Sequence, residues 1–321
     1  MMSQHFLLTA KARTLSLKKI YKMGEAAAYD LFRQIRWPET DGEAVCPQCG
    51  CYESYNITTR RKFKCKGCHH QYSVTSGTIL HSRKLDFTDL LAAICVFVTG
   101  SKGMSAVQFS RMLDVQYKTA WVLAHKMREC LADETDTHKL DGEVEIDGAY
   151  FGGHIRPANF KSERIDRRLR HHQTGTRRVV IALRERMGRT LPFVRKSEAD
   201  GVALAHGIVR DGTTIFADEA THWDKLAWGY DTKRVNHSTE YSLGGGVHTN
   251  WVESYFSRLR KMVSGQHHWV SPKYLQQYAE HAAWLEDHRR ECTGGLAKRI
   301  VRAALIAPKS RQFGGYWQRA A

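Results

Sequence analysis

The spacing of hydrophobic and polar residues predicts helices in the first half of the chain. Between residues 86 and 133, apolar residues recur at intervals of three or four. The helical period breaks at residues 100–103, before Ser105, which can cap a new helix, and again at residues 114–116. This pattern is typical of a helix-turn-helix, and a purely structural bundle of three helices has the same spacing. The apolar positions of the first stripe are Leu90, Leu91, Ile94 and Val98.

After residue 140, short β-branched runs alternate with helical stretches. The runs predict strands over residues 143–151, 179–184, 191–194 and 213–218, and the spacing over 199–209 predicts a helix. Residues 247–265 predict a second helix, in which an apolar stripe lies opposite a polar face. We therefore predict a multi-domain α/β protein.

The cysteines indicate a metal site rather than a disulfide framework. Eight are present, and five lie between residues 46 and 68. Cys46, Cys49, Cys65 and Cys68 form two C-x2-C pairs, the spacing at which four thiolates bind one zinc ion. A redox-active site needs only one such pair. We predict an N-terminal zinc ribbon with a structural Zn2+, and Cys51 as a spare thiol that competes with the four ligands.

The charge of the chain favours an acidic partner. Its 49 Lys+Arg exceed its 33 Asp+Glu, which gives a net charge of +16 at pH 7. Five cations between residues 60 and 66 would repel one another without an anionic neighbour, and the phosphates of double-stranded DNA are the partner that we expect. A solvated run of charges is the alternative. The cations expected to contact DNA are Arg60, Arg61, Lys62 and Lys64 in the ribbon, Lys118 and Lys126 in the helix-turn-helix, and Arg260 and Lys261 further on.

A second basic segment follows the strand predicted over residues 143–151. Residues 154–178 carry many Lys and Arg and show little apolar period. We predict a mobile loop that becomes ordered on nucleic acid, and the alternative is a solvated insertion.

Three acids lie at positions from which their carboxylates could converge on a metal ion. Asp147 and Asp218 lie near the ends of two predicted strands, and Glu253 lies on the polar face of the helix predicted over 247–265. Carboxylates that converge need cations, and Mg2+ or Mn2+ prefers oxygen ligands. Two such ions about 3.5–4 Å apart can support the displacement of an oxygen at phosphorus. Asn250, one turn before Glu253, competes as the third ligand; we favour the carboxylate because it binds divalent ions better than an amide.

These features resemble the bacterial insertion-sequence DDE transposases of the ISXO-like group, which carry an N-terminal zinc ribbon. The resemblance implies an RNase H-like catalytic core, a mixed β-sheet flanked by helices, in which Asp147, Asp218 and Glu253 match the first, second and third acids. Several relatives carry an acid directly after the first Asp, where this chain has Gly148. The motifs that carry the resemblance are CPQCG at 46–50, FKCKGCHHQYSVTSGTI at 63–79, EIDGAYFGG at 145–153, HTNWVESYFSRLRK at 248–261 and SPKYLQQYAEH at 271–281.

The resemblance also implies an organisation and a reaction. We divide the chain into a helical segment with the zinc ribbon (1–84), a helix-turn-helix (85–135), the catalytic core (140–292) and a C-terminal basic tail (293–321). The implied reaction releases a 3′-OH at the end of the element by hydrolysis and joins it to a target phosphodiester, with two Mg2+ or Mn2+ ions. The implied partners are the terminal inverted repeats, target DNA and further copies of the chain.

Two other classes of protein share these residues. An RNase H-like nuclease or resolvase cuts without strand transfer, and a domesticated DNA-binding regulator needs only the ribbon and the helix-turn-helix. The intact set of acids argues against the regulator. A nucleotide-dependent metabolic enzyme lacks support, because the chain has neither a GxGxxG nor a GxxxxGK[ST] motif. No apolar run reaches the roughly 18 residues of a membrane span, and we expect a protein of the bacterial cytoplasm, associated with the nucleoid.

Overall fold

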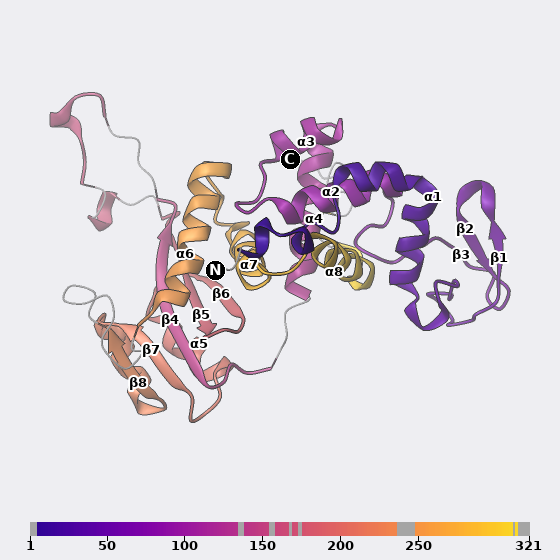
Figure 1. Ribbon diagram of the computed structural model, residues 1–321. Helices are drawn as coiled ribbons and strands as arrows, with labels where there is room; N and C mark the ends of the chain where they lie inside the picture. The colour runs from indigo at the N-terminus through magenta and orange to yellow at the C-terminus, as the bar shows by residue number, and fades with distance from the viewer. Residues whose placement is uncertain are drawn as a thin grey trace. The chain divides into compact units, whose positions relative to one another are not determined.

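The chain forms two compact units. A computed structural model describes residues 5–133, 138–153, 158–166, 169–172, 175–235, 248–310 and 312–313 (Figure 1). The first unit combines residues 1–135 with residues 288–321, and the second unit holds residues 136–287. In the described ranges, no helix has the length and apolarity that crossing a membrane requires.

The first unit is built around a buried helix, α2. All positions of α2 from Phe87 to Val98 are buried except Asp89, because other helices cover every side of it. Those that pack against it are α1, α3 and α8. The α-helices of this unit are α1 (Leu17–Arg36), α2 (Phe87–Thr99), α3 (Ala106–Leu113), α4 (Tyr117–Asp133) and α8 (Thr293–Ile306).

The helices predicted between residues 86 and 133 are present. Ser105 caps α3, since its hydroxyl accepts a hydrogen bond from the Gln108 amide at 3.2 Å, as predicted. A three-residue connection then leads into α4, and Asp114 turns the chain with a φ of 49°. Residues 85–135 pack with α1 and α8 in one unit instead of forming a separate domain, because α2 is apolar on all sides and needs both neighbours to bury it.

The C-terminal segment differs from the predicted basic tail. Residues 293–306 form α8, whose apolar side is buried against α1, α2 and α4. The chain after α8 also pairs with the end of the ribbon, where the Ile79 amide donates to the Ala307 carbonyl at 2.9 Å. Basic residues of α8 therefore lie on one side of a packed helix.

The ribbon contributes a small antiparallel sheet in the order β1-β2-β3. Its strands are β1 (Ser54–Ile57), β2 (Lys62–Cys65) and β3 (Gln71–Tyr72). Residues 71–80 alternate β-branched and small residues, which predicts a last ribbon strand ending near Gly77, whereas β3 ends at Tyr72. Ser73 and Ser76 close a turn there, in which the Ser73 amide donates to the Ser76 hydroxyl at 2.9 Å.

The second unit contains a mixed sheet of five strands in the order β6-β5-β4-β7-β8. β4 pairs antiparallel with β5 and parallel with β7, and β8 extends the sheet parallel to β7. Four of the strands match the prediction closely, and β8 was not predicted. The strands are β4 (Glu143–Phe151), β5 (Arg178–Glu185), β6 (Thr190–Arg195), β7 (Thr214–Asp218) and β8 (Asp231–Val235).

Different helices contribute to the two faces of this sheet. On one face, Ile146, Ile215 and Ala217 pack with Trp223 of η7 (Thr221–Trp228) and with α5 (Asp200–Ile208). On the other face lie α6 (Asn250–Met262) and α7 (Leu275–Asp287), which contact β4, β5 and β6. Figure 1 shows α6 running along β4. A mixed sheet flanked by helices confirms the predicted fold class and is consistent with an RNase H-like core.

Short helical turns complete the described chain. The 3-10 turns besides η7 are η1 (Phe6–Leu8), η2 (Ala10–Ala12), η3 (Pro38–Thr40), η4 (Thr58–Arg60), η5 (Lys161–Glu163) and η6 (Arg170–His172), and a π-helical turn, η8 (Val263–His267), extends α6.

Candidate functional site

Asp147 and Asp218 lie on neighbouring parallel strands at the same level of the sheet. The register pairs Ile146 with Ala217, so the two acids follow side by side on the face that α6 covers. Each accepts a backbone hydrogen bond: Asp147 from Gly148 at 2.7 Å and Asp218 from Ala220 at 3.1 Å. The structure therefore brings together the first two predicted acids.

The pKa of Asp147 is raised to about 7, chiefly because the side chain is buried. The amide of Gly148 opposes this shift, and the negative charges of Asp218 and Glu198 add to it. Arg260, on α6, lowers the pKa again. The protein thus compensates the ionised form of Asp147 poorly, and a cation would stabilise that form.

Glu198 is a third acid beside this pair, and no pattern in the sequence pointed to it. It lies between β6 and α5, in a stretch with no recognisable motif. Tyr150 hydrogen bonds to its carboxylate, and His222 Nε2 lies 4.0 Å from Glu198 Oε1. Burial raises the pKa of Glu198; the charge of His222 opposes the shift, and the charge of Asp218 adds to it.

The two candidates for the third ligand lie at the start of α6. Glu253 is half-buried, and its carboxylate accepts a hydrogen bond from the Thr249 hydroxyl at 3.3 Å, whereas Asn250 is exposed. Within the described residues, no three acids have their ligand atoms within 4.8 Å of one another. The choice between Glu253 and Asn250 therefore stays a prediction.

Glu145 fixes the start of α6 to the sheet. It lies two residues before Asp147 on β4 and is fully buried. One oxygen of its carboxylate accepts hydrogen bonds from the amides of Trp251 and Val252 at 2.8 and 2.9 Å, and the other pairs with Arg186 Nε at 3.0 Å. A buried carboxylate at a helix N-terminus satisfies free amides and interacts favourably with the helix dipole. Glu145 is thereby committed to holding α6.

A second buried ion pair fixes the middle of α6. Arg184 of β5 donates to the Trp251 carbonyl at 2.7 Å and lies 3.4 Å from Glu286 of α7, which also pairs with Arg258 at 2.8 Å. These contacts join β5, α6 and α7. The helix that carries Glu253, Asn250 and Arg260 is therefore held at two points.

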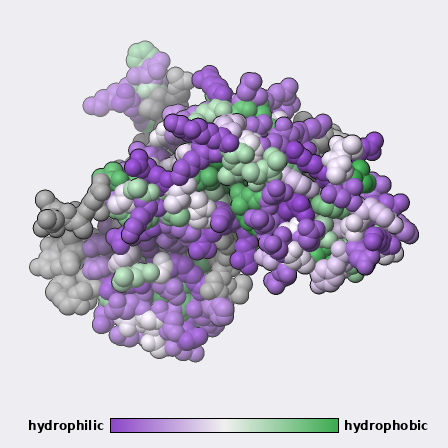
Figure 2. Space-filling view, turned by 45° about the vertical axis from the view of Figure 1, so that its right-hand side comes forward, coloured by the Kyte–Doolittle hydropathy of each residue, from purple (hydrophilic) through white to green (hydrophobic). Residues whose placement is uncertain are grey.

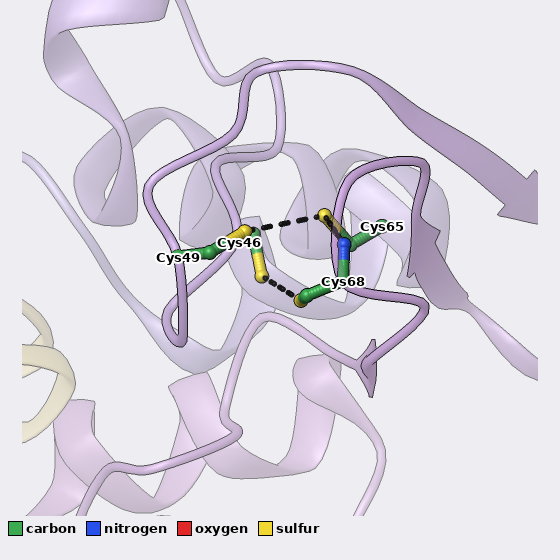
Figure 3. Close-up of side chains that lie close together, drawn as sticks. All are labelled: Cys46, Cys49, Cys65 and Cys68. Atoms are coloured by element: carbon green, nitrogen blue, oxygen red, sulfur yellow. Dashed lines mark hydrogen bonds between the residues drawn. The ribbon is translucent and has the colours of Figure 1, made fainter.

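The four predicted zinc ligands converge in the first unit (Figure 3). Their sulfur atoms all lie within 4.8 Å of one another, with 3.6 Å between Cys46 and Cys68 and 3.5 Å between Cys49 and Cys65. A tetrahedral site with Zn–S bonds of about 2.3 Å has sulfur separations of about 3.8 Å, so the cluster suits a structural Zn2+. The backbone amide of Cys68 contributes to lowering the pKa of the Cys65 thiol to about 6, which favours the thiolate. Cys51 is not part of this cluster.

The predicted DNA-contacting cations differ in their surroundings. Arg61 pairs with Glu25 of α1, a contact within the first unit that leaves it less available to DNA. Arg60 and Lys62 are exposed, Lys64 is half-buried, and among the described residues none of the three has an ion-pair partner. Figure 2 shows that hydrophilic residues cover most of the face it draws.

The remaining predicted cations lie on helices. Lys118 is exposed in the first turn of α4, whereas Lys126 is half-buried, and burial lowers its pKa. Arg260 and Lys261 are exposed on α6. The basic segment predicted over residues 154–178 lies partly outside the described residues; its described parts include η5 and η6.

A four-cysteine zinc-ribbon cluster and a mixed sheet that carries two adjacent acids are consistent with the class of RNase H-like proteins that have an N-terminal zinc ribbon. The comparisons with known proteins agree with this class. Residues 139–287 match the ISXO2-like transposase domain, and residues 23–71 match the transposase zinc-ribbon domain. The chain thus combines an ISXO2-like DDE transposase domain with an N-terminal transposase zinc-ribbon domain. None of the curated proteins matches it.

Proposed function

We propose that the protein is the transposase of an insertion sequence, which binds the ends of its element, cuts them and joins them to target DNA. The observation that carries this proposal is that Asp147 and Asp218 directly follow the paired residues Ile146 and Ala217 on adjacent parallel strands of the ISXO2-like domain. The family implies DNA binding and phosphoryl transfer, and the positive charge of the chain is in keeping with both.

The acids fit a divalent ion by their chemistry. Asp147 and Asp218 offer carboxylate oxygens, which Mg2+ and Mn2+ prefer, and the pKa of Asp147 is raised by its burial and by the neighbouring acids. Glu253 would complete the site from α6, with Asn250 as the alternative. Bound Mg2+ or Mn2+, as one ion or a pair, would supply positive charge that stabilises the phosphate and the departing oxygen.

The reaction has two displacements at phosphorus. In the first, a water oxygen forms a bond to the phosphorus at the element end while the P–O3′ bond breaks, which leaves a 3′-OH and a 5′-phosphate. In the second, this 3′-oxygen attacks a target phosphorus, and the target strand's 3′-oxygen leaves. Arg260 and Lys261 are exposed on the helix beside the acids, and we assign them to holding the DNA phosphate.

The DNA ends would be bound mainly by the first unit. Arg60, Lys62 and Lys64 in the ribbon and Lys118 at the start of α4 are the cations that we assign to phosphate contacts. Because two element ends are joined in one event, we propose that copies of the chain assemble on the DNA.

A cleavage and joining assay tests this function. The substrates are double-stranded oligonucleotides with the terminal repeats that flank the gene, in Mg2+ or Mn2+, and the variants are Asp147→Ala, Asp218→Ala, Glu253→Ala and Asn250→Ala. We expect the two aspartate variants to lose cleavage and joining by a factor of about a thousand or more while they still bind DNA. Of the other two, the variant that loses activity identifies the third ligand.

Three outcomes would change the conclusion. Cleavage without joining by the wild type would indicate an RNase H-like nuclease or resolvase. DNA binding without cleavage in either metal, with verified ends, would indicate a regulator. Full activity of Asp147→Ala and Asp218→Ala would exclude the proposed site.

A further inference from the structure

Gly148 follows Asp147 on β4, and a glutamate side chain fills the space beside its α-carbon. A Cβ atom at position 148 would lie 2.6 Å from Glu198 Cδ and 2.8 Å from Glu198 Cγ. Real side-chain contacts do not occur at these distances, so an alanine at this position would displace Glu198. Glycine at 148 therefore admits a carboxylate, from the segment before α5, next to Asp147.

The surroundings of Glu198 leave its charge only weakly compensated. Its side chain is largely buried, with Tyr150 as a neutral hydrogen-bond partner and His222 Nε2 4.0 Å from its nearer oxygen. The negative charge of Glu198 also acts on Asp147 and Asp218. Three acids that repel one another in a desolvated place are unfavourable unless a cation binds among them.

We propose that Glu198 is a further carboxylate ligand of the divalent-ion site formed by Asp147 and Asp218. This inference rests on the proposed function, because it takes the ion to bind at these two acids. With Glu198, three carboxylates come from the sheet and from the segment before α5, without any contribution from α6. Glu253 or Asn250 then serves the same site from the opposite direction.

The acids do not form a compact set of ligands around a single ion. Within the described residues, no three carboxylates lie within 4.8 Å of one another, so a compact shell around one ion is not preformed. Two ions about 3.5–4 Å apart distribute their ligands over a wider area than one ion does.

Binding of Mn2+ to the full chain tests the role of Glu198 directly. We would titrate Mn2+ into the wild type, Glu198→Gln, Asp147→Asn and Glu219→Gln, and measure the dissociation constants by calorimetry. Glu219 is the matched control, because it is an exposed acid directly after Asp218. We expect Glu198→Gln to weaken Mn2+ binding by about tenfold or more. The control should stay within about twofold of the wild type.

Thermal unfolding without added Mn2+ separates a ligand from a structural residue. Glutamine keeps the size of Glu198 and a hydrogen bond with Tyr150, and it removes repulsion with Asp147 and Asp218. We therefore expect an unchanged or higher midpoint for Glu198→Gln, and a smaller increase of the midpoint on addition of Mn2+. A lower midpoint together with wild-type Mn2+ affinity would show a structural role and overturn the proposal.

The space at Gly148 provides a rescue experiment. Gly148→Ala should weaken Mn2+ binding because its methyl group displaces the Glu198 carboxylate. In Gly148→Asp/Glu198→Ala, the new carboxylate enters the space that Glu198 leaves, and we expect Mn2+ to bind about fivefold or more tightly than to Glu198→Ala alone. Wild-type affinity in both Glu198→Gln and Gly148→Ala would overturn the proposal.

The variant Asp147→Asn separates a failure of the proposed metal site from a failure of the role assigned to Glu198. If it loses Mn2+ binding and Glu198→Gln does not, the role of Glu198 is wrong and the metal site of the proposed function stands. If Asp147→Asn binds Mn2+ like the wild type, the proposed metal site is wrong, and the role of Glu198 falls with it.

Discussion

Acids that are close neighbours in the sequence have very different surroundings in the sheet. Glu145 is fully buried, yet Arg186 and two helix amides compensate its charge. Asp147, two residues further along β4, receives one backbone hydrogen bond and lies near two other acids. The first acid is therefore structural, and the second is suited to bind a proton or a metal ion.

The raised pKa of Asp147 predicts a pH dependence of stability. The folded-state pKa of about 7 lies above the ordinary value of 3.8, so the folded protein binds the extra proton between these values. This contribution to stability is complete below the lower value and is lost as the pH rises through about 7. Asp147→Asn lacks the titrating group, so its stability should not show this loss as the pH rises.

Urea unfolding at about pH 5 and about pH 8, without Mg2+ or Mn2+, measures this effect. Between these pH values, we expect the wild type to lose on the order of 2 kcal/mol of unfolding free energy relative to Asp147→Asn. Other groups titrate equally in both proteins and cancel in the comparison. Parallel pH profiles of the two proteins would contradict the assigned environment of Asp147.

At the scale of elements, α6 is positioned by buried charges. The start of α6 depends on Glu145, whose Arg186 partner also pairs with Glu143 at 3.3 Å. Glu143 is exposed, whereas Glu145 is buried. The two acids therefore offer a matched comparison of a buried and an exposed ion pair with the same arginine.

We expect Glu145→Gln to lower the unfolding free energy of the second unit by about 3 kcal/mol. The amide group cannot accept all the hydrogen bonds of the carboxylate, and the charge of Arg186 loses its buried partner. Glu143→Gln should cost less than about 1 kcal/mol, since solvent screens that pair. Denaturant unfolding of both variants provides the measurement. Equal losses would show that burial does not decide the contribution of Glu145.

The strands that could be predicted are those whose own sequence shows alternating or continuous apolar side chains. β4, β5, β6 and β7 alternate or bury their side chains along their length, and their predicted ends differ from the observed ends by one residue or less. β8 reads DTKRV, with only Val235 buried, because it is an edge strand that pairs with β7 alone. Its polar sequence gave no sign of a strand.

The residues of the candidate sites that could be predicted are those marked by a local feature of the sequence. Asp147, Asp218 and the four cysteines follow from strand ends and from spacing. Glu198 could not be found in this way, because it reaches the acids only through the packing of the segment before α5 against Gly148. From the sequence, Gly148 shows only that this chain lacks the acid that several relatives carry directly after the first Asp.

At the scale of the whole molecule, the first unit is discontinuous in sequence. Residues 288–321 return to residues 1–135 after the second unit is complete. The sequence predicts only a basic tail over residues 293–321, whereas the structure buries the apolar side of α8 against α1, α2 and α4. Contacts far apart in sequence decide this, such as the Ile79 amide donating to the Ala307 carbonyl.

The stability of the first unit should therefore depend on α8. Ile300 is fully buried on this helix, and Ile300→Ala should lower the unfolding free energy of the first unit by about 2–4 kcal/mol, because truncation leaves a cavity. Lys298→Ala is the control, since Lys298 is exposed on the same helix and its substitution should cost less than about 0.5 kcal/mol.

Release of zinc to a coloured chelator during denaturant unfolding reports on the first unit, which contains the ribbon. Binding of Mn2+ reports on the second unit and should be unchanged in both variants. Loss of Mn2+ binding in Ile300→Ala, with zinc release as in the wild type, would assign α8 to the second unit instead.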